Sequence, residues 1–393
     1  MKARRSNGDG AIDKVKRTRK DGTIVECWRG RVSVGDDPRT GKPRRVAVYA
    51  STRSELATKI AKVKTDALLG IIPSTDRITV RGFMERWLVD VAAARVRATT
   101  LELYHGMVRT HILPAIGSKR LAALTGQDVQ GVLSVMQRAG KSERTRTLVL
   151  VLLRAALDQA MQWNLVPRNV ARTVDRPRQV RKEIQPLTVE QAQVFLRIAS
   201  SRRFAALYEL AILVGLRRGE LLGLQWNDVD FDAGTLSIVR SIVTLHGKPI
   251  VAETKTAAGR RRVHLPRRTV RALKEQQARL FSLGLRASPW VFPNENGEPM
   301  NPRNLIRRSF EPILAEAMNV EKEAGRAFPR IRFHDLRHTS ATISMNLLIP
   351  PKVVQERLGH ASIGVTMDTY SHVSASIQRE AAERIDAAFA ADG

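Results

Sequence analysis

The segment 334–370 concentrates the side chains of this chain that are best suited to chemistry. His334 and Arg337 lie three residues apart, His360 directly follows Gly359, and Tyr370 comes ten residues later. Guanidinium and imidazole groups can hold a phosphodiester, and a phenol can attack it. The segment therefore predicts a site that cleaves a phosphodiester with a tyrosine nucleophile, while the rest of the chain supplies DNA to it.

A second group of candidates lies upstream, in the sequence Gly215-Leu-Arg217-Arg-Gly219-Glu220. The glycines predict a tight break that places Arg217 at a helix start, where backbone N–H groups also favour an anion. No HExxH, magnesium-type carboxylate cluster or Walker loop occurs in the sequence, so protein cations must meet the charge on phosphorus. We expect Arg217 and Arg337 to clamp both non-bridging oxygens, because one guanidinium bonds two oxygens at once.

The attacking and leaving oxygens both need proton transfer. A tyrosine pKa of about 10 leaves roughly one Tyr370 phenol in a thousand ionised at neutral pH, so Arg and His must favour the phenolate or accept its proton. His334 lies one helical turn before Arg337 and should share its face. Lys255 is the natural proton donor to the leaving 5′-oxygen, and we expect it at or near a hairpin tip. Lys248 lies in the same predicted hairpin and is an alternative donor.

Each of these residues also has a purely structural explanation. A chain with eight His and many Arg gives an HxxR about once by chance, and a second match, His264 to Arg267, contains a proline. His360 can be no more than the residue after a helix that Gly359 ends, and Tyr370 can belong to a core. The order and context of the motifs together favour the chemical interpretation.

Length, charge and cysteine content limit the kind of protein. A chain of 393 residues predicts two or three domains. The net charge of +28, from 66 Lys plus Arg and 38 Asp plus Glu, requires a polyanion as partner, and nucleic acid is favoured over anionic membrane because the basic residues are spread along the chain. One cysteine, Cys27, excludes an intramolecular disulfide. With no signal peptide and no long apolar run, we expect a soluble protein of the bacterial cytoplasm, associated with the nucleoid and not with membrane.

Residues 1–70 are expected to form a basic DNA-binding domain. Residues 1–20 carry eight Lys or Arg, as either a solvated tail or a basic arm on DNA. Alternating apolar residues predict strands near 23–34 and 44–49, followed by a helix over 54–69. Such a sheet, backed by one helix, can read a major groove with the arginines Arg29, Arg31, Arg44 and Arg45.

The remainder predicts a helical domain, a linker and a larger domain. Residues 76–166 predict four helices: 79–91, one opened by a Thr99–Glu102 capping box and ended by the segment 113–117, one from Thr125 to Gly140, and 142–163. Residues 167–186 predict a basic linker along a phosphate backbone, with Arg176, Arg178, Arg181 and Lys182. Residues 187–393 predict helices over 188–199 and 203–215, then strands over 236–245, 248–253 and 260–265.

Five motifs in order resemble the active-site boxes of the tyrosine recombinases. They are Gly215-Leu-Arg217-Arg-Gly219-Glu220, Lys255, His334-Asp-Leu-Arg337-His, Leu358-Gly359-His360 and Thr369-Tyr370-Ser-His. The resemblance implies that Arg217 and Arg337 clamp the scissile phosphate, that His334 and His360 hydrogen-bond it and assist proton transfer, and that Lys255 protonates the leaving hydroxyl. Tyr370 would form a 3′-phosphotyrosine, Glu220 would orient the site, and no cofactor is implied.

The same resemblance implies a multidomain, mainly α fold with small β-sheets: a β-sheet plus helix domain, a four-helix core-binding domain of SAM-like type and an α+β catalytic domain. It implies an integrase of a phage or mobile element that acts as a homotetramer on double-stranded DNA attachment sites, through a Holliday junction. A DNA-bending host factor and a directionality factor are candidate partners. A helix over 374–389 would dock on a neighbouring subunit or pack on its own domain. The alternatives are a Xer-like resolvase, a type IB-like topoisomerase and a DNA-binding regulator with a vestigial site.

Overall fold

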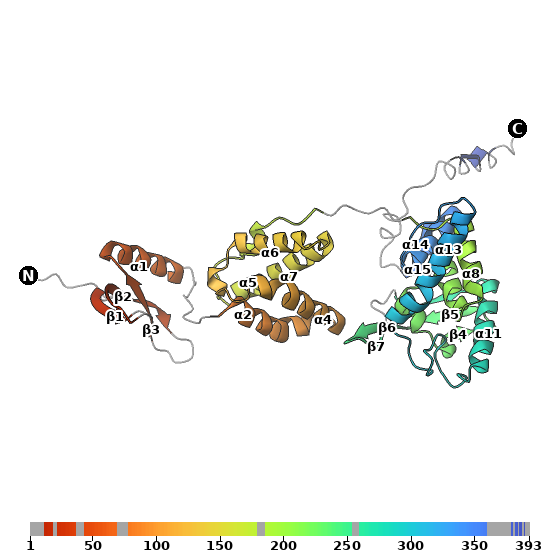
Figure 1. Ribbon diagram of the computed structural model, residues 1–393, viewed down its shortest axis with the longest axis horizontal. Coiled ribbons are helices and arrows are strands. Elements are labelled where there is room, and N and C mark those ends of the chain that lie inside the picture. The colour runs from red at the N-terminus through yellow and green to blue at the C-terminus, as the bar shows by residue number, and fades with distance from the viewer. Residues whose placement is uncertain are drawn as a thin grey trace, which may run out of the picture. The chain divides into compact units, whose positions relative to one another are not determined.

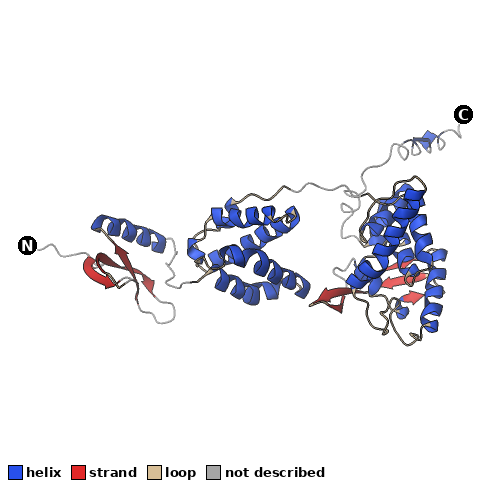
Figure 2. Cartoon of the chain, in the orientation of Figure 1, coloured by secondary structure: helices blue, strands red, loops and turns tan. Residues whose placement is uncertain are grey.

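The structure is a computed structural model that describes residues 12–18, 22–36, 43–68, 78–178, 185–253, 259–359 and six single positions between 379 and 389. The chain divides into two units, Met1–Val180 and Arg181–Gly393 (Figure 1). Helices predominate and the sheets are small, as the sequence predicts (Figure 2). Among the described residues, no helix is long and apolar enough to cross a membrane.

The first unit begins with a three-stranded antiparallel sheet in the order β1-β2-β3, followed by one helix. Its elements are β1 (Ile12–Thr18), β2 (Ile24–Asp36), β3 (Pro43–Ala50) and α1 (Arg53–Leu68). The sequence predicts β2, β3 and α1 but no strand over residues 12–18, which it assigns to either a solvated tail or a basic arm. These residues pair with β2 from Ile12 opposite Gly30 to Thr18 opposite Ile24.

Helix α1 covers one face of this sheet and leaves the other uncovered by any described element. Gly30 faces α1, since a Cβ at this position would lie 2.5 Å from Ile60 Cδ1. Alternation along a strand then places Arg29 and Arg31 on the opposite face, together with Arg45 of β3. Arg44 lies in β3, but its side chain is outside the described residues. The open face therefore carries a row of arginines.

The helical part of the first unit packs around α7, which buries one face that includes Val149, Leu153, Ala156 and Ala160. Its helices are α2 (Val80–Trp87), α3 (Ala93–Arg95), α4 (Ala98–Met107), α5 (Leu113–Ile116), α6 (Gly126–Arg138) and α7 (Glu143–Gln162). Thr125 and Asp128 form the capping box that the sequence predicts for α6. Ser142 caps α7 as predicted, because its side chain accepts a hydrogen bond from the Thr145 N–H.

One predicted boundary in this part is wrong. The Thr99–Glu102 pair does not cap a helix, because α4 already begins at Ala98 with Arg97 as N-cap. The predicted end over residues 113–117 is confirmed, because α5 ends at Ile116 with Gly117 as C-cap. Pro114 itself lies inside α5. A π turn over Val108–Ile112 precedes it and places the proline in the first turn of α5, where a missing N–H costs little.

The beginning of the predicted linker packs on this helical core. Asn169 is buried, and Ala171 and Val174 join the core cluster around α7. Arg154 fixes them by donating from Nε to the Ala171 carbonyl at 3.1 Å and from Nη2 to the Val174 carbonyl at 2.5 Å. The exposed basic segment therefore begins after Val174. Arg176 and Arg178 are exposed there, while Arg181 and Lys182 lie outside the described residues.

The second unit surrounds an aromatic core that includes Phe195, Tyr208, Phe310 and Phe333. Its helices are α8 (Val189–Ser200), α9 (Ala205–Leu213), α10 (Arg218–Leu222), α11 (Arg267–Ser282), α12 (Pro302–Leu305), α13 (Glu311–Glu323), α14 (Asp335–Asn346) and α15 (Pro351–Leu358). Its strands are β4 (Val229–Asp230), β5 (Thr235–Ile238), β6 (Arg240–Leu245), β7 (Lys248–Glu253) and β8 (Arg261–His264). They form a sheet ordered β4-β5-β8 and a separate β6-β7 hairpin.

The strand pairing corrects two predictions. The predicted strand 236–245 is interrupted at Val239, and its two halves, β5 and β6, belong to different sheets. β8 pairs with β5, with Arg261 opposite Ile238, and not with β7. The tip of the β6-β7 hairpin is His246-Gly247, so Lys255 is not at that tip. Lys255 itself lies outside the described residues, between β7 and β8, and Lys248 begins β7 beside the turn.

Candidate active site

Arg217 and Glu220 are oriented by the first turn of α10. Arg217 is the N-cap of this helix, and the Glu220 carboxylate accepts the Arg217 backbone N–H at 3.0 Å through Oε2. Glu220 Oε1 also accepts from Arg217 Nη1 at 2.8 Å. The Arg217 side chain keeps 40% of its surface exposed, whereas that of Glu220 keeps 5%. A buried carboxylate therefore holds a guanidinium that remains accessible to a ligand.

Gly215, two residues before Arg217, brings this turn against α14 and α15. Its φ is +77°, and a Cβ at this position would lie 2.3 Å from Leu358 Cδ2 and 2.9 Å from Ser340 Oγ. Both the left-handed backbone and the close approach require glycine. The predicted break between α9 and α10 thus also lies against α14 and α15.

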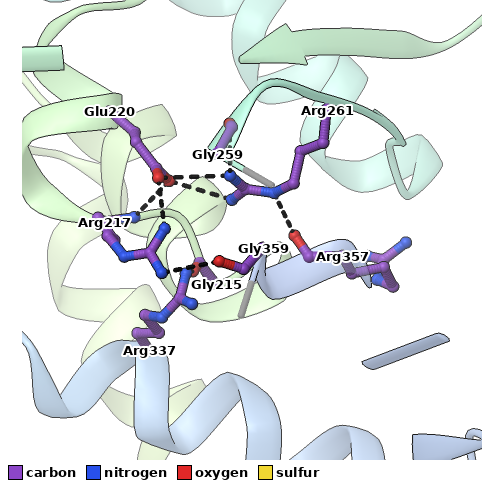
Figure 3. A network of polar contacts seen from close by, with 8 residues as sticks. All are labelled: Gly215, Arg217, Glu220, Gly259, Arg261, Arg337, Arg357 and Gly359. Carbon is purple, nitrogen blue, oxygen red and sulfur yellow. Dashed lines mark hydrogen bonds and ion pairs between the residues drawn. The ribbon is translucent and has the colours of Figure 1, made fainter. Parts of the chain in front are cut away.

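Arg337 reaches the same turn from α14. The residue is 3% exposed, and its Nη1 donates to the Gly215 carbonyl at 2.7 Å. Arg217 and Arg337, which are 120 residues apart in the sequence, are therefore brought to one turn of the backbone (Figure 3). The two cations of the predicted clamp thus lie at the same turn, and their contact with a phosphate stays a prediction.

Arg217 also holds the end of α15. Gly359 ends this helix with a φ of +67°, and its carbonyl accepts from Arg217 Nη2 at 2.9 Å. His360 is the next residue but lies outside the described residues, as do Lys255 and Tyr370. The structure therefore brings Arg217, Glu220 and Arg337 together and leaves Lys255, His360 and Tyr370 without a described position.

His334 is the N-cap of α14 and lines a pocket of about 1020 Å³ together with Arg217. The residue as a whole is exposed, yet the surrounding protein atoms desolvate the imidazole and lower its pKa to about 4, and His338 and Arg337 add to this shift. The rings of His334 and His338 meet edge to face, with centroids 5.2 Å apart. His334 is therefore neutral at pH 7 and can accept a proton or a hydrogen bond. His338 was not among the predicted site residues.

The low pKa gives a pH prediction. We expect His334→Gln to lower single-turnover DNA cleavage by about 100-fold, the lower end for loss of a proton-transfer group. Because His334 is already neutral, the ratio of wild-type to variant rates should stay constant from about pH 5.5 to 8. Cleavage rates measured on one DNA substrate across this range test it. A ratio that halves around pH 6.5 would show an ordinary histidine pKa instead.

The same shift predicts the direction of a stability change. The folded pKa lies below the ordinary value of about 6.5, so the unfolded chain binds more protons between these two values. The stability that a neutral His334 contributes is complete above about pH 6.5 and is lost as the pH falls towards 4. Denaturation of wild type and His334→Gln at both ends of this window measures the difference.

Arg261 and Arg357 complete a polar network that sequence reasoning missed (Figure 3). Arg261 Nη2 donates to Glu220 Oε2 at 3.0 Å, and Arg261 Nε donates to the Arg357 carbonyl at 2.7 Å. Burial raises the pKa of Glu220, but Arg261 and then Arg217 outweigh it and hold this pKa below its ordinary value. Glu220 is therefore an anion shared by two arginines.

Tyr208 is the one described tyrosine of the second unit, and it is unsuited to nucleophilic attack. It is fully buried, and its hydroxyl bonds the Ser309 hydroxyl at 2.8 Å. Burial raises the pKa of its phenol, so the phenolate is strongly disfavoured. The sequence has four tyrosines, and Tyr370 is the other one in the second unit.

Two family models match the chain in the parts described above. The model of the phage integrase family matches residues 185–376, and that of the phage integrase N-terminal SAM-like domain matches residues 79–136. The chain belongs to the phage integrase family of tyrosine recombinases. It is thus a DNA strand-transferring enzyme, and this result confirms the resemblance seen in the motifs.

Relatives in this family align with nearly the whole chain. An integrase of Saccharopolyspora erythraea is 25% identical over 425 residues, which cover 92% of this chain and 94% of the relative. A XerC-like tyrosine recombinase of Caldanaerobacter subterraneus subsp. tengcongensis is 26% identical, covering 93% and 97%. The ICEBs1 integrase of Bacillus subtilis is 25% identical, covering 90% and 95%.

Solved structures show the same fold. The Tn1549 transposon integrase in complex with transposon right end DNA has a TM-score of 0.66 at 21% identity, covering 78% of this chain and 99% of that one. A lambda integrase tetramer bound to a Holliday junction has a TM-score of 0.56 at 19% identity, covering 95% and 99%. The mostly helical, multidomain fold is therefore that of the tyrosine recombinase integrases.

Proposed function

We propose that this protein is a site-specific integrase that cuts and rejoins DNA through a covalent link between Tyr370 and a 3′-phosphate. The observation that carries the proposal is the meeting of Arg217 and Arg337 at the Gly215 turn, with Glu220 behind them, in a chain of the phage integrase family. Two guanidinium groups at one point suit a scissile phosphate, because each can bond two of its oxygens.

The reaction proposed at this site needs no metal for its charge balance. The Tyr370 phenolate attacks phosphorus, a P–O bond forms, and the bond from phosphorus to the 5′-oxygen breaks. The phenolic proton passes to a base, for which neutral His334 is the described candidate, with His360 assisting. Lys255, or Lys248 in its place, gives the 5′-oxygen its proton. The phosphotyrosine keeps the bond energy, so the reverse attack by a 5′-hydroxyl rejoins DNA without ATP.

The basic surface of the first unit supports binding of double-stranded DNA attachment sites. Arg29, Arg31 and Arg45 share the open face of a three-stranded sheet, a shape that can enter a major groove. Arg176 and Arg178 are exposed after the helical core and can follow a phosphate backbone. With a net charge of +28, we expect affinity to fall steeply with salt.

Assembly into a homotetramer that exchanges strands through a Holliday junction belongs to the same proposal. It is supported by the lambda integrase tetramer on a Holliday junction, which shares this fold. The described positions of the C-terminal segment are helical, and Ile385 and Phe389 are 59% and 82% exposed, which suits docking on a neighbouring subunit. The Tn1549 transposon integrase, which shares this fold, supports action on a mobile element. A host bending factor and a directionality factor are further partners in this proposal.

The test is formation of a covalent DNA adduct in the absence of metal. Purified full-length protein is incubated in EDTA with a nicked duplex carrying a site selected for binding from a random library. The nick releases a short strand, so the cleaved intermediate cannot religate. We expect a denaturation-resistant protein–DNA band, with the DNA linked to the peptide that contains Tyr370 by mass spectrometry. No adduct on a site that the protein binds would favour a DNA-binding regulator instead.

A further inference from the structure

Arg261 is an arginine that faces the interior from a strand. It lies in β8 opposite Ile238, and its side chain keeps 8% of its surface exposed. A buried guanidinium must have its donors satisfied. Those of Arg261 bond the Glu220 carboxylate, the Arg357 carbonyl and, at 3.3 Å, the Gly259 carbonyl. One side chain thus joins α10, the start of β8 and the end of α15.

The first consequence concerns the charge available to a phosphate. Glu220 is buried with its charge, and its two oxygens accept from both Arg217 and Arg261. With both arginines the three side chains carry a net charge of +1. With Arg217 alone they would carry none, and the carboxylate would be held by Arg217 only. Arg261 therefore frees part of the positive charge of Arg217 for a ligand.

The second consequence concerns the segment that leads to His360. Arg261 Nε holds the Arg357 carbonyl, two residues before Gly359, whose carbonyl is held by Arg217. The Arg357 side chain donates in return to the carbonyls of His264 at 3.2 Å and Leu213 at 3.4 Å. β8 and the last turn of α15 are thus bound to each other by side chains from both partners.

From these contacts we infer that Arg261 is a positioning residue of the strand-cleavage site, which orients Arg217 through Glu220 and fixes the end of α15 before His360. The inference rests on the proposed function, since the group that it positions is the phosphate clamp. Arg261 itself does not contact the phosphate in this arrangement. Its loss should slow the chemical step and leave DNA binding unchanged.

The two neighbours of Arg261 provide matched controls. Arg260 pairs with Glu253 and Arg262 with Asp230, and their side chains are 58% and 62% exposed. All three residues lose the same charge on substitution by glutamine, but only Arg261 contacts Glu220. Exposed ion pairs contribute little to stability, so these controls should fold normally.

The experiment compares Arg261→Gln, Arg261→Lys, Arg260→Gln and Arg262→Gln in the full-length protein. The dissociation constant for the selected DNA site and the single-turnover rate of adduct formation are measured separately. We expect Arg261→Gln to cleave about 100-fold more slowly at saturating protein, because the clamp is misplaced. The cleavage rate of Arg261→Lys should lie between those of wild type and Arg261→Gln, since lysine keeps the charge but lacks the planar fork. The two controls should stay within about fivefold of wild type.

A second substrate separates positioning from a general folding defect. A methylphosphonate at the scissile position replaces one charged oxygen by a methyl group. The transition state then carries less negative charge, so the cleavage rate depends less on the two arginines of the clamp. The ratio of wild-type to Arg261→Gln rates should therefore shrink on this substrate, whereas a smaller folded fraction would leave it unchanged. Hydrogen exchange should also become faster in peptides covering 353–359 and 216–222 of Arg261→Gln but not of the controls.

The outcomes distinguish a failure of the positioning role of Arg261 from a failure of the proposed function. A wild-type adduct with an equal cleavage rate in Arg261→Gln contradicts the positioning role and leaves the proposed function intact. An equal rate ratio on both substrates contradicts it as well. If wild type forms no adduct with Tyr370, the proposed function fails, and the positioning role fails with it.

Discussion

Tyr370→Phe is expected to bind the selected DNA site as tightly as wild type and to form no covalent adduct with it. Phenylalanine lacks the oxygen that would bond to phosphorus, so no neighbouring cation or base can compensate. Affinity for DNA comes mainly from many phosphate contacts, and one hydroxyl contributes little to it. A gel-shift titration and a denaturing gel of the same samples measure the two properties side by side.

Tyr208→Phe is the matched control for this substitution. The Tyr208 hydroxyl is buried and bonds Ser309, so its loss should cost about 1 kcal/mol of stability and leave the adduct at wild-type level. An adduct that persists in Tyr370→Phe and disappears in Tyr208→Phe would reverse the assignment. Such a result would require Tyr208 to leave the core of the second unit.

The sequence predicts the local structure of the fold well where one short segment decides it. Thr125 with Asp128 and Ser142 begin helices as expected, since a cap needs only the side chain and the backbone of the next turn. Gly359 ends α15 with a left-handed backbone for the same reason. The Thr99–Glu102 pair fails because the helix already begins at Ala98, with Arg97 as N-cap and no side-chain cap.

Errors appear where distant segments decide the structure. Nothing local distinguishes residues 236–245 from one strand, yet β5 pairs with β8 and β6 with β7, and the chain breaks at Val239. The sequence does not predict β1, because exposed Lys and Arg are also typical of a solvated tail. The strand conformation of β1 comes from its pairing with β2. Strand pairing is non-local, so it cannot be inferred from composition alone.

The candidate site shows the same division. The motif around Arg217 and Glu220 is local, and the Arg337 motif resembles a family box, so both were predicted. Arg261 stands between two other arginines, and its contact with Glu220 joins residues that are 41 apart in the sequence. One signal was present: Arg261 alternates with the buried Val263 along β8, which places it on the inner side of the strand.

Arg337→Gln is expected to lower the rate of adduct formation by about 100- to 1,000-fold, the range for loss of one charged donor to a transition state. Arg337 is 3% exposed and bonds the Gly215 carbonyl at 2.7 Å, so the substitution should also destabilise the second unit by about 1–3 kcal/mol. Single-turnover cleavage at saturating protein and chemical denaturation separate the two effects.

Arg202→Gln is the control for the removal of one arginine from this unit. Arg202 pairs with Glu316, and the two side chains are 50% and 45% exposed, so cleavage and stability should both stay near wild type. Arg337→Lys should recover part of the rate, because the charge returns without the fork that bonds two oxygens. Wild-type cleavage by Arg337→Gln would show that Arg337 serves only to hold Gly215.

Combining Arg337→Gln with Arg217→Gln tests whether the two cations act on one phosphate. The Arg217 side chain is 40% exposed, so its substitution should cost less stability than that of Arg337 while affecting cleavage to a similar degree. When two groups act as one unit, the rate loss of the double variant is smaller than the product of the two single-variant rate losses. A double variant that is no more than about tenfold slower than the slower single variant would indicate a shared phosphate, and a fully multiplicative loss would place the two arginines on independent steps.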